Sequence, residues 1–181
     1  MKISRVLSIV FSVVALLVAG NVAAQDDMMT KVDYSAEQLR AIASADFAGL
    51  DGNRLKVSDY KGKVVILDFW ETWCAPCLET FPVLAKLSEE YPEDFVVLAI
   101  SPGLSDSRKK VKAFVEEKGY DFRFAYGDEV MDLITQLEAY GLPFKVFIDA
   151  EGNYVTTVMG AYSPEHDYKE IKSIIEANKK G

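Results

Sequence analysis

The sequence has little cysteine and histidine and no run of basic residues. Only two cysteines, Cys74 and Cys77, and one histidine, His166, occur in 181 residues. Structural zinc needs four ligands, usually including two cysteine pairs, so no metal site is expected. Lysine and arginine total 20 against 28 acidic residues and form no long cluster, which argues against nucleic acid as a partner.

The first 24 residues have the composition of an export signal. Lys2 and Arg5 precede an apolar run from Val6 to Ala19, and small residues at 22–24 offer a cleavage site. We expect a signal peptide over 1–24, whose removal leaves 18 basic and 28 acidic side chains, a net charge of -10, in an exported, periplasmic protein. A membrane-anchored form is the alternative, although the apolar run is short for a bilayer span of ~20 residues.

The rest of the chain has the length of one domain and alternates predicted strands and helices. A polar, disordered stretch at 25–31 and a short helix at 35–45 form an N-terminal extension, 25–45. Apolar runs, turns and caps then predict a hairpin at 47–57, strands at 63–70, 95–100, 122–125, 144–148 and 154–159, and helices at 75–91, 107–118, 129–140 and from 164 onward. This order is typical of an α/β fold with a largely parallel sheet and an antiparallel edge formed by the last two strands.

The two cysteines lie in FWETWCAPCLETF, where a predicted buried strand meets the next helix. A thiol at a helix N-terminus faces unpaired N–H groups and the positive end of the helix dipole, so its pKa falls. Cys74, expected to be exposed at the helix start, is therefore predicted to be the nucleophile, and Cys77 to attack the resulting mixed disulfide. Pro76 stiffens the first helical turn between them. An inert buried pair is the alternative to this redox interpretation.

Three segments resemble one family. FWETWCAPC resembles the FW-x-x-WC-x-x-C signature of thioredoxin-fold proteins, and DGNRLKVSDYKGKVVILDFW is similar to the lead-in of the exported TlpA/ResA-like branch. YGLPFKVFIDAEGNYV is similar to the Gly-x-Pro segment and hairpin of that family. The resemblance covers about residues 46–162 and implies a thioredoxin-like domain over 46–181. It also implies a central mixed sheet flanked by helices, with a strand-helix element inserted at 105–126.

The resemblance implies roles for individual residues. Cys74 and Cys77 match the attacking and resolving thiols, and Pro143 matches a cis-proline that packs against their disulfide. Asp68 matches a buried acid, and burial raises the pKa of a carboxyl group, which suits Asp68 to accept a proton from Cys77. The alternative is an Asp68 held by hydrogen bonds under the helix. Client contacts are expected at four residues near the cysteines: Trp73, Ala75, Pro76 and Leu142.

Two other positions depart from the family pattern. The branch often has glutamate three residues after the second cysteine, where this chain has Thr80; Glu79 stands one residue earlier, about 100° round the helix. Phe144 and Lys145 follow the matched proline, where two small hydroxyl residues are common. We therefore expect client recognition to differ from that of the family, with Glu79 as a candidate tuning residue.

Glu71 is a third departure, because a small residue usually follows FW. A negative charge three residues before Cys74 would oppose formation of the thiolate, raise the Cys74 pKa and make the dithiol a stronger reductant. The alternative is that Glu71 points into solvent and affects only the choice of client.

The sequence thus predicts an exported thiol-disulfide oxidoreductase that needs no cofactor, and the resemblance implies that it reduces or exchanges disulfides of extracytoplasmic proteins. The resemblance implies a membrane thiol relay as electron donor and cytochrome c maturation as one task, and we expect a monomer. A thiol peroxidase on the same fold is one alternative, although the usual proline before its cysteine is absent. A redox-inert binding module is the other.

Overall fold

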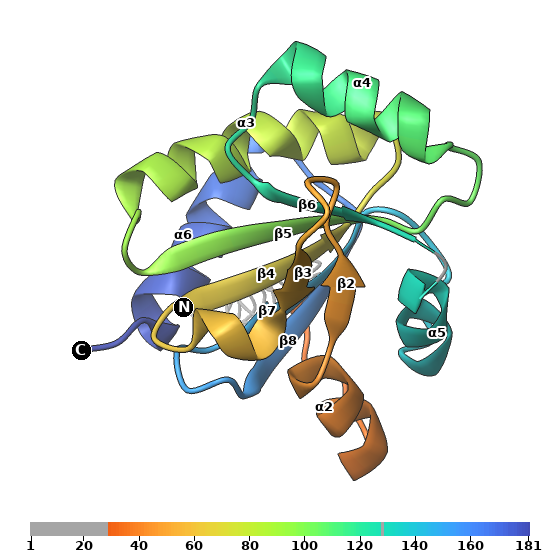
Figure 1. Cartoon of the computed structure of the whole chain (residues 1–181). Coiled ribbons are helices and arrows are strands. Elements are labelled where there is room, and N and C mark those ends of the chain that lie inside the picture. The colour runs from red at the N-terminus through yellow and green to blue at the C-terminus, as the bar shows by residue number, and fades with distance from the viewer. Residues whose placement is uncertain (1–28, 128) are drawn as a thin grey trace, which may run out of the picture.

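A six-stranded mixed sheet forms the centre of the structure (Figure 1). The computed structural model describes residues 29–127 and 129–181, so the predicted signal peptide lies outside the described residues. The strands of the sheet are β1 (Met29–Thr30), β4 (Val64–Phe69), β5 (Phe95–Ser101), β6 (Arg123–Tyr126), β7 (Phe144–Ile148) and β8 (Tyr154–Met159). Their spatial order is β1-β8-β7-β4-β5-β6. β4, β5 and β6 run parallel, whereas β7, β8 and β1 are paired antiparallel.

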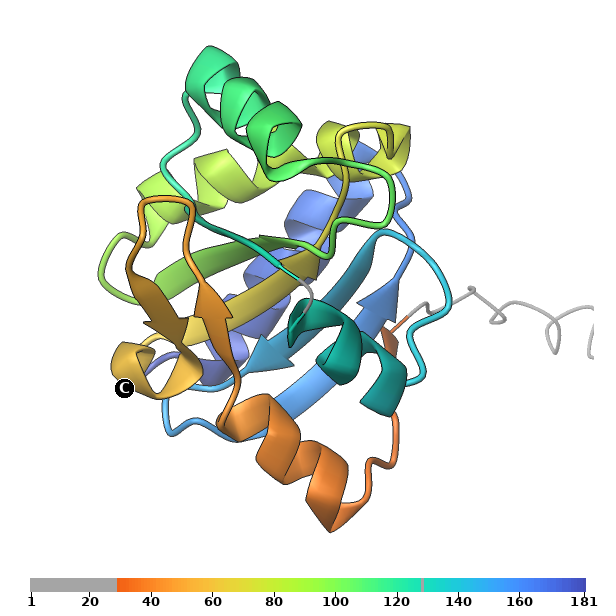
Figure 2. The ribbon, with the colours of Figure 1, turned by 45° about the vertical axis from the view of Figure 1, so that its right-hand side comes forward.

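Helices cover both faces of this sheet (Figure 1, Figure 2). They are α2 (Ala36–Ala43), the 3-10 helix η1 (Val57–Tyr60), α3 (Ala75–Glu90), α4 (Arg108–Lys118), α5 (Glu129–Gln136) and α6 (Pro164–Asn178). α3, α4 and α6 share one apolar core with the sheet, and α2, α5 and the hairpin of β2 (Asp46–Ala48) and β3 (Arg54–Lys56) share the other. No helix of the described residues is both long and apolar enough to span a membrane.

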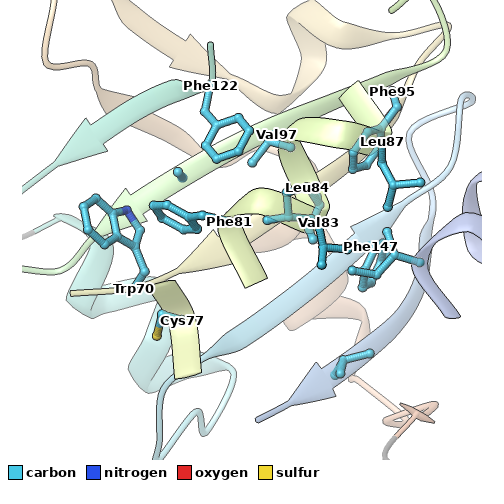
Figure 3. Close-up of a cluster of buried hydrophobic side chains, with 14 of the residues drawn as sticks. Trp70, Cys77, Phe81, Val83, Leu84, Leu87, Phe95, Val97, Phe122 and Phe147 are labelled. Carbon is cyan, nitrogen blue, oxygen red and sulfur yellow. The ribbon is translucent and has the colours of Figure 1, made fainter. Parts of the chain in front are cut away.

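The central strand β4 supplies alternate residues to the two cores. The core under α3 and α6 receives Val64, Ile66 and Trp70, and the opposite core receives Val65, Leu67 and Phe69. Because side chains alternate across a strand, Asp68 faces the α3 side with Ile66 and Trp70. Figure 3 shows Cys77 at one end of this cluster, close to Trp70 and Phe81, whose rings are 4.9 Å apart. The second cysteine of the pair is thus a core residue.

Most predicted elements are confirmed within a few residues. Ser35, Ser107 and Ser163 are N-caps whose side chains accept a hydrogen bond from a main-chain N–H in the first turn of their helix. The strand predicted at 122–125 lies at 123–126, and the helix predicted at 129–140 ends at residue 136. The early end of α5 has a local cause, because Glu138 adopts a left-handed φ of 55° that does not continue a helix.

Two predictions about the sheet edge were wrong. The stretch expected to be disordered contains β1, which pairs with Val158 and Thr157 of β8, so β8 is not an edge strand. The Val32 N–H then donates to the Tyr154 hydroxyl at 3.2 Å, and the Tyr34 ring packs edge-on against Tyr154. Three of the six strands are parallel to one another. The sheet is therefore mixed, as the resemblance implied, and not largely parallel. Local composition carried no signal for β1, because its partner lies more than a hundred residues away.

Candidate active site

Cys74 and Cys77 form a disulfide at the start of α3. Cys74 is the N-cap residue and Cys77 lies in the first turn, with 5.3 Å between their Cα atoms. Cys74 is 3% exposed and Cys77 0%, so the expectation of an exposed Cys74 is wrong for this oxidised state. Both residues belong to the apolar core under α3. The order of the pair still places Cys74 at the helix terminus, where the dipole favours a thiolate.

The loop before β7 contributes a cis peptide bond between Leu142 and Pro143, which confirms the predicted cis-proline. Pro143 is buried and its carbonyl accepts a hydrogen bond from the Gly160 N–H at 2.8 Å. Leu142 is half-buried and packs against both cores. Within residues 29–127 and 129–181, the main-chain N–H and C=O of Leu142 have no hydrogen-bonding partner. This short stretch of main chain can therefore pair with an extended segment of another protein.

Asp68 is fully buried on the α3 side of β4, and neither of its carboxylate oxygens has a hydrogen-bonding partner among the described residues. The alternative of an Asp68 held by hydrogen bonds is therefore wrong. Its closest charge is the buried Lys145, which lies opposite it on β7, with 3.8 Å between Nζ and Oδ1. Burial raises the pKa of Asp68 to about 6, and the charge of Lys145 partly opposes this rise. Such a carboxyl group can take up or release a proton near neutral pH.

Glu71 is also fully buried, so the alternative in which it points into solvent is wrong. Its Oε1 accepts hydrogen bonds from the Ser101 hydroxyl and from the N–H groups of Gly103 and Leu104, at 2.7–3.1 Å. Its Oε2 accepts three more at 3.0–3.4 Å, from the Trp73 indole Nε1 and the main-chain N–H groups of Ser105 and Asp106. These donors offset the negative charge of Glu71. Its predicted effect on the Cys74 pKa stays a prediction.

A second carboxylate fastens the same loop. Asp106 is buried and accepts hydrogen bonds from the main-chain N–H and the hydroxyl of Thr72, the latter at 2.9 Å. Lys110 lies 2.6 Å from its Oδ1. Burial acts to raise the Asp106 pKa, but the hydrogen bonds from Lys110 and Thr72 outweigh it and hold the pKa below its ordinary value. Hydrogen bonds thus connect the two loops in both directions: Glu71 accepts from the loop after β5, and Thr72 donates to Asp106 of that loop.

An apolar hollow of about 280 Å³ lies beside the cysteines, between Trp73 and the segment from α5 to β7. Its lining includes Leu104, Met131, Ile134, Tyr140, Leu142 and Phe144. The structure thus brings Trp73 and Leu142, two of the predicted client-contacting residues, to one hollow. Ala75 and Pro76 are exposed on the first turn of α3.

Glu79 and Thr80 occupy opposite environments on α3. Glu79 is exposed, whereas Thr80 is buried and its hydroxyl donates to the Pro76 carbonyl at 3.0 Å. A role for Glu79 in proton transfer or tuning stays a prediction without a contact that supports it. Within the described residues, one set of side chains, His166, Asp167 and Glu170 on α6, brings atoms of the kind that bind metals within 4.8 Å of one another. It includes neither cysteine.

Sequence reasoning missed Lys145 as the partner of Asp68, and it missed the loop that surrounds Glu71. The Lys145–Asp68 pair could have been predicted, because antiparallel pairing of the strands at 64–69 and 144–148 places residue 145 opposite residue 68. The loop around Glu71 could not have been, because the donors to Glu71 come from a loop that begins 30 residues later. Ser101-Pro102-Gly103 carried only the signal of a strand end.

Comparisons with known proteins agree with this geometry. The model of the AhpC/TSA family matches residues 39–175, which include both cysteines and Pro143. The thiol-disulfide oxidoreductase ResA of Bacillus subtilis (strain 168) is 34% identical over 128 residues, 67% of this chain and 68% of that protein. ResA of Bacillus thuringiensis subsp. konkukian (strain 97-27) is 32% identical over 127 residues, 69% and 71% of the two chains. The solved structure of the exposed lipoprotein thioredoxin Etrx1 from Streptococcus pneumoniae strain TIGR4 has a TM-score of 0.60 and 29% identity, covering 71% of this chain and 98% of that one.

Proposed function

Because this chain belongs to the AhpC/TSA family and is a thiol-disulfide oxidoreductase, we propose that it reduces disulfides of extracytoplasmic proteins. The observation that carries the proposal is the position of Cys74 at the N-terminus of α3, with Cys77 in the first turn of the helix. The unpaired main chain of Leu142 supports a protein client, because an extended segment can pair with it.

The proposed reaction transfers two electrons from the cysteine pair to the client. The Cys74 thiolate attacks one sulfur of the client disulfide, forming a mixed disulfide and releasing the other client sulfur as a thiolate. The Cys77 thiolate then attacks Cys74, which closes the Cys74–Cys77 disulfide and releases the second client sulfur. Each released thiolate takes up a proton, and an external dithiol restores the reduced pair.

Asp68 is proposed as the base that takes the proton from Cys77 before its attack. Both residues face the α3 side of the sheet, and a carboxyl group with a pKa of about 6 is partly protonated close to neutral pH. Lys145 keeps part of the Asp68 population ionised and so able to accept that proton.

The place of action and the electron donor belong to the same proposal. The apolar segment at 6–19 supports export, and a reductant outside the cytosol requires a donor, for which a membrane thiol relay is the proposed class. Reduction of apocytochrome cysteines before haem attachment is the proposed task. Sequencing of the exported protein is expected to give Gln25 as its first residue; a retained apolar segment would indicate an anchored form.

Trapping tests the order of attack. The full-length Cys77→Ala variant, produced in cells, should accumulate client proteins disulfide-bonded to Cys74, because the resolving thiol is absent. The matched Cys74→Ala variant should trap little, and mass spectrometry of the reduced eluates identifies the clients. Equal trapping by the two variants would contradict the assignment of nucleophile and resolving thiol.

A thiol peroxidase is the second candidate, favoured by the description of the family as AhpC/TSA. The reduced protein mixed with hydrogen peroxide distinguishes the two. If hydrogen peroxide oxidises the cysteine pair more slowly than a protein disulfide does, the result supports the reductase. Rapid peroxide consumption without any client supports the peroxidase.

A further inference from the structure

The hollow beside the cysteines has walls that are unusually exposed for large apolar side chains. Trp73 is 54% exposed, Leu104 52% and Tyr140 87%, and all three line it. A patch of this kind on a soluble protein marks a site of interaction. Its volume of about 280 Å³ is just below the ~300–1,000 Å³ of pockets that enclose drug-sized ligands, so it suits one large side chain.

Glu71 is buried, but it accepts hydrogen bonds from two of the residues that line the hollow, Trp73 and Leu104. Its Oε2 accepts the hydrogen bond of the Trp73 indole at 3.3 Å, and its Oε1 accepts that of the Leu104 main-chain N–H at 3.1 Å. One carboxylate therefore sets the position of two exposed side chains that come from different loops.

Gly103 brings the main chain of the Leu104 loop into close contact with Tyr126. Its φ is 73°, and a Cβ atom at this position would lie 2.7 Å from the Tyr126 hydroxyl. That hydroxyl donates to the Asp106 carbonyl at 2.9 Å. The loop is thus held between Glu71 on one side and Tyr126 on the other, which leaves Leu104 directed to the hollow.

We propose that Glu71 is a positioning residue for client selection: it holds Trp73 and Leu104 as two walls of a pocket that accepts a large apolar side chain close to the reacting cysteine of the client. This inference rests on the proposed function, because the client must lie along Leu142 and Cys74. The adjoining position of Leu142, which lines the same hollow and has unpaired main-chain groups, places the side chains of such a client beside the pocket.

The test compares two glutathionylated peptides that differ only in having phenylalanine or serine on both sides of the cysteine. Stopped-flow mixing of each with the reduced full-length protein gives a rate constant and its dependence on peptide concentration. We expect the phenylalanine peptide to react about 10-fold more efficiently, the low end of what an apolar pocket discriminates. The difference should lie in the concentration at half-saturation.

Three variants separate positioning from folding. Leu104→Ser changes an exposed side chain, and Glu71→Gln places an amide NH₂ group against main-chain N–H donors. Both should lower the ratio of the phenylalanine rate to the serine rate to about twofold or less. The rate of each variant with oxidised glutathione reports any change in Cys74 reactivity that is common to all disulfides. Leu39→Ser, on α2 and also exposed, is the control and should keep the preference.

The outcomes distinguish the two proposals. Failure of the parent protein to reduce either peptide contradicts the proposed function itself. Equal rates for both peptides contradict the pocket alone. A Glu71→Gln protein that is equally slow with both peptides and glutathione, beside a Leu104→Ser protein that retains the preference, would overturn the positioning role and leave Glu71 a purely structural residue.

Discussion

Two carboxylates close together in the sequence are buried, Asp68 near the end of β4 and Glu71 in the loop that follows. They differ in how many hydrogen bonds they accept. Glu71, in the loop, accepts six hydrogen bonds, most of them from main-chain N–H groups. Asp68, in the strand, accepts none among the described residues and faces one lysine at 3.8 Å. Removal of a carboxylate from water is costly unless hydrogen bonds or charges compensate it. Glu71 therefore holds the main chain of a loop in place, whereas Asp68 has a pKa near neutral pH and can change its protonation state.

The largest expected effect is on stability. Glu71→Ala should lower the free energy of unfolding at pH 7 by about 3 to 5 kcal/mol, because four main-chain N–H donors, one buried and three partly buried, lose their acceptor at ~1–3 kcal/mol each and water restores part of this. Asp68→Asn, the matched change of a buried carboxylate, should not destabilise the protein. Urea unfolding of both variants measures the difference. Equal losses would show that the hydrogen bonds around Glu71 do not set the contrast.

The second prediction concerns the pH dependence of stability. The folded-state pKa of Asp68, about 6, lies above the ordinary 3.8, so the folded protein binds this proton more tightly than the unfolded chain. The resulting stabilisation is complete well below pH ~4 and is lost as the pH rises through about 6, by about 3 kcal/mol in total. The free energy of unfolding of the parent minus that of Asp68→Asn should fall by about 2.4 kcal/mol between pH 4 and 7, because the rest of the total is already lost below pH 4. Parallel curves would contradict the raised pKa.

The third prediction tests the role of Asp68 in the reaction. If Asp68 is the base for Cys77, Asp68→Asn should slow the release of client from the mixed disulfide by about 100-fold at pH 7. Formation of the mixed disulfide by Cys74 should change far less. Single-turnover measurement of both steps, with Glu79→Gln as the control for an exposed acid on the same helix, checks this assignment. A loss confined to the first step would assign Asp68 to Cys74 instead.

The smallest expected effect comes from Lys145. Its positive charge lowers the Asp68 pKa, so Lys145→Met should raise that pKa further, by about one unit. The pH at which the release step reaches half its maximal rate should move upward by the same amount. Carbonyl resonances of labelled aspartate give an independent measurement. An unchanged midpoint would mean that Lys145, whose ammonium lies 3.3 Å from the Gly160 carbonyl, acts only on the neighbouring main chain.

Local sequence patterns predicted most of the fold for physical reasons that the structure makes explicit. The apolar runs that became β4 and β5 are buried on both faces, and the serine caps fixed where three helices begin. β1 escaped prediction because two residues carry no periodicity. At the site, the position of the cysteines at a strand-to-helix junction identified the reactive pair, and the resemblance identified the cis-proline. The environment of Glu71 depends on a loop brought close only by folding, and no local pattern reports such contacts.

The short strand β1 has a consequence for the protein in a crowded compartment. An open sheet edge offers a row of main-chain groups on which a second copy can assemble, and this is a common route to aggregation. Here β1 pairs with residues 157 and 158, while at the far edge Gly49 bridges Ala125 and the Leu50 N–H donates to the Phe124 carbonyl. Two residues of β8 and part of the outer strand β6 are thus withheld from pairing with a second copy.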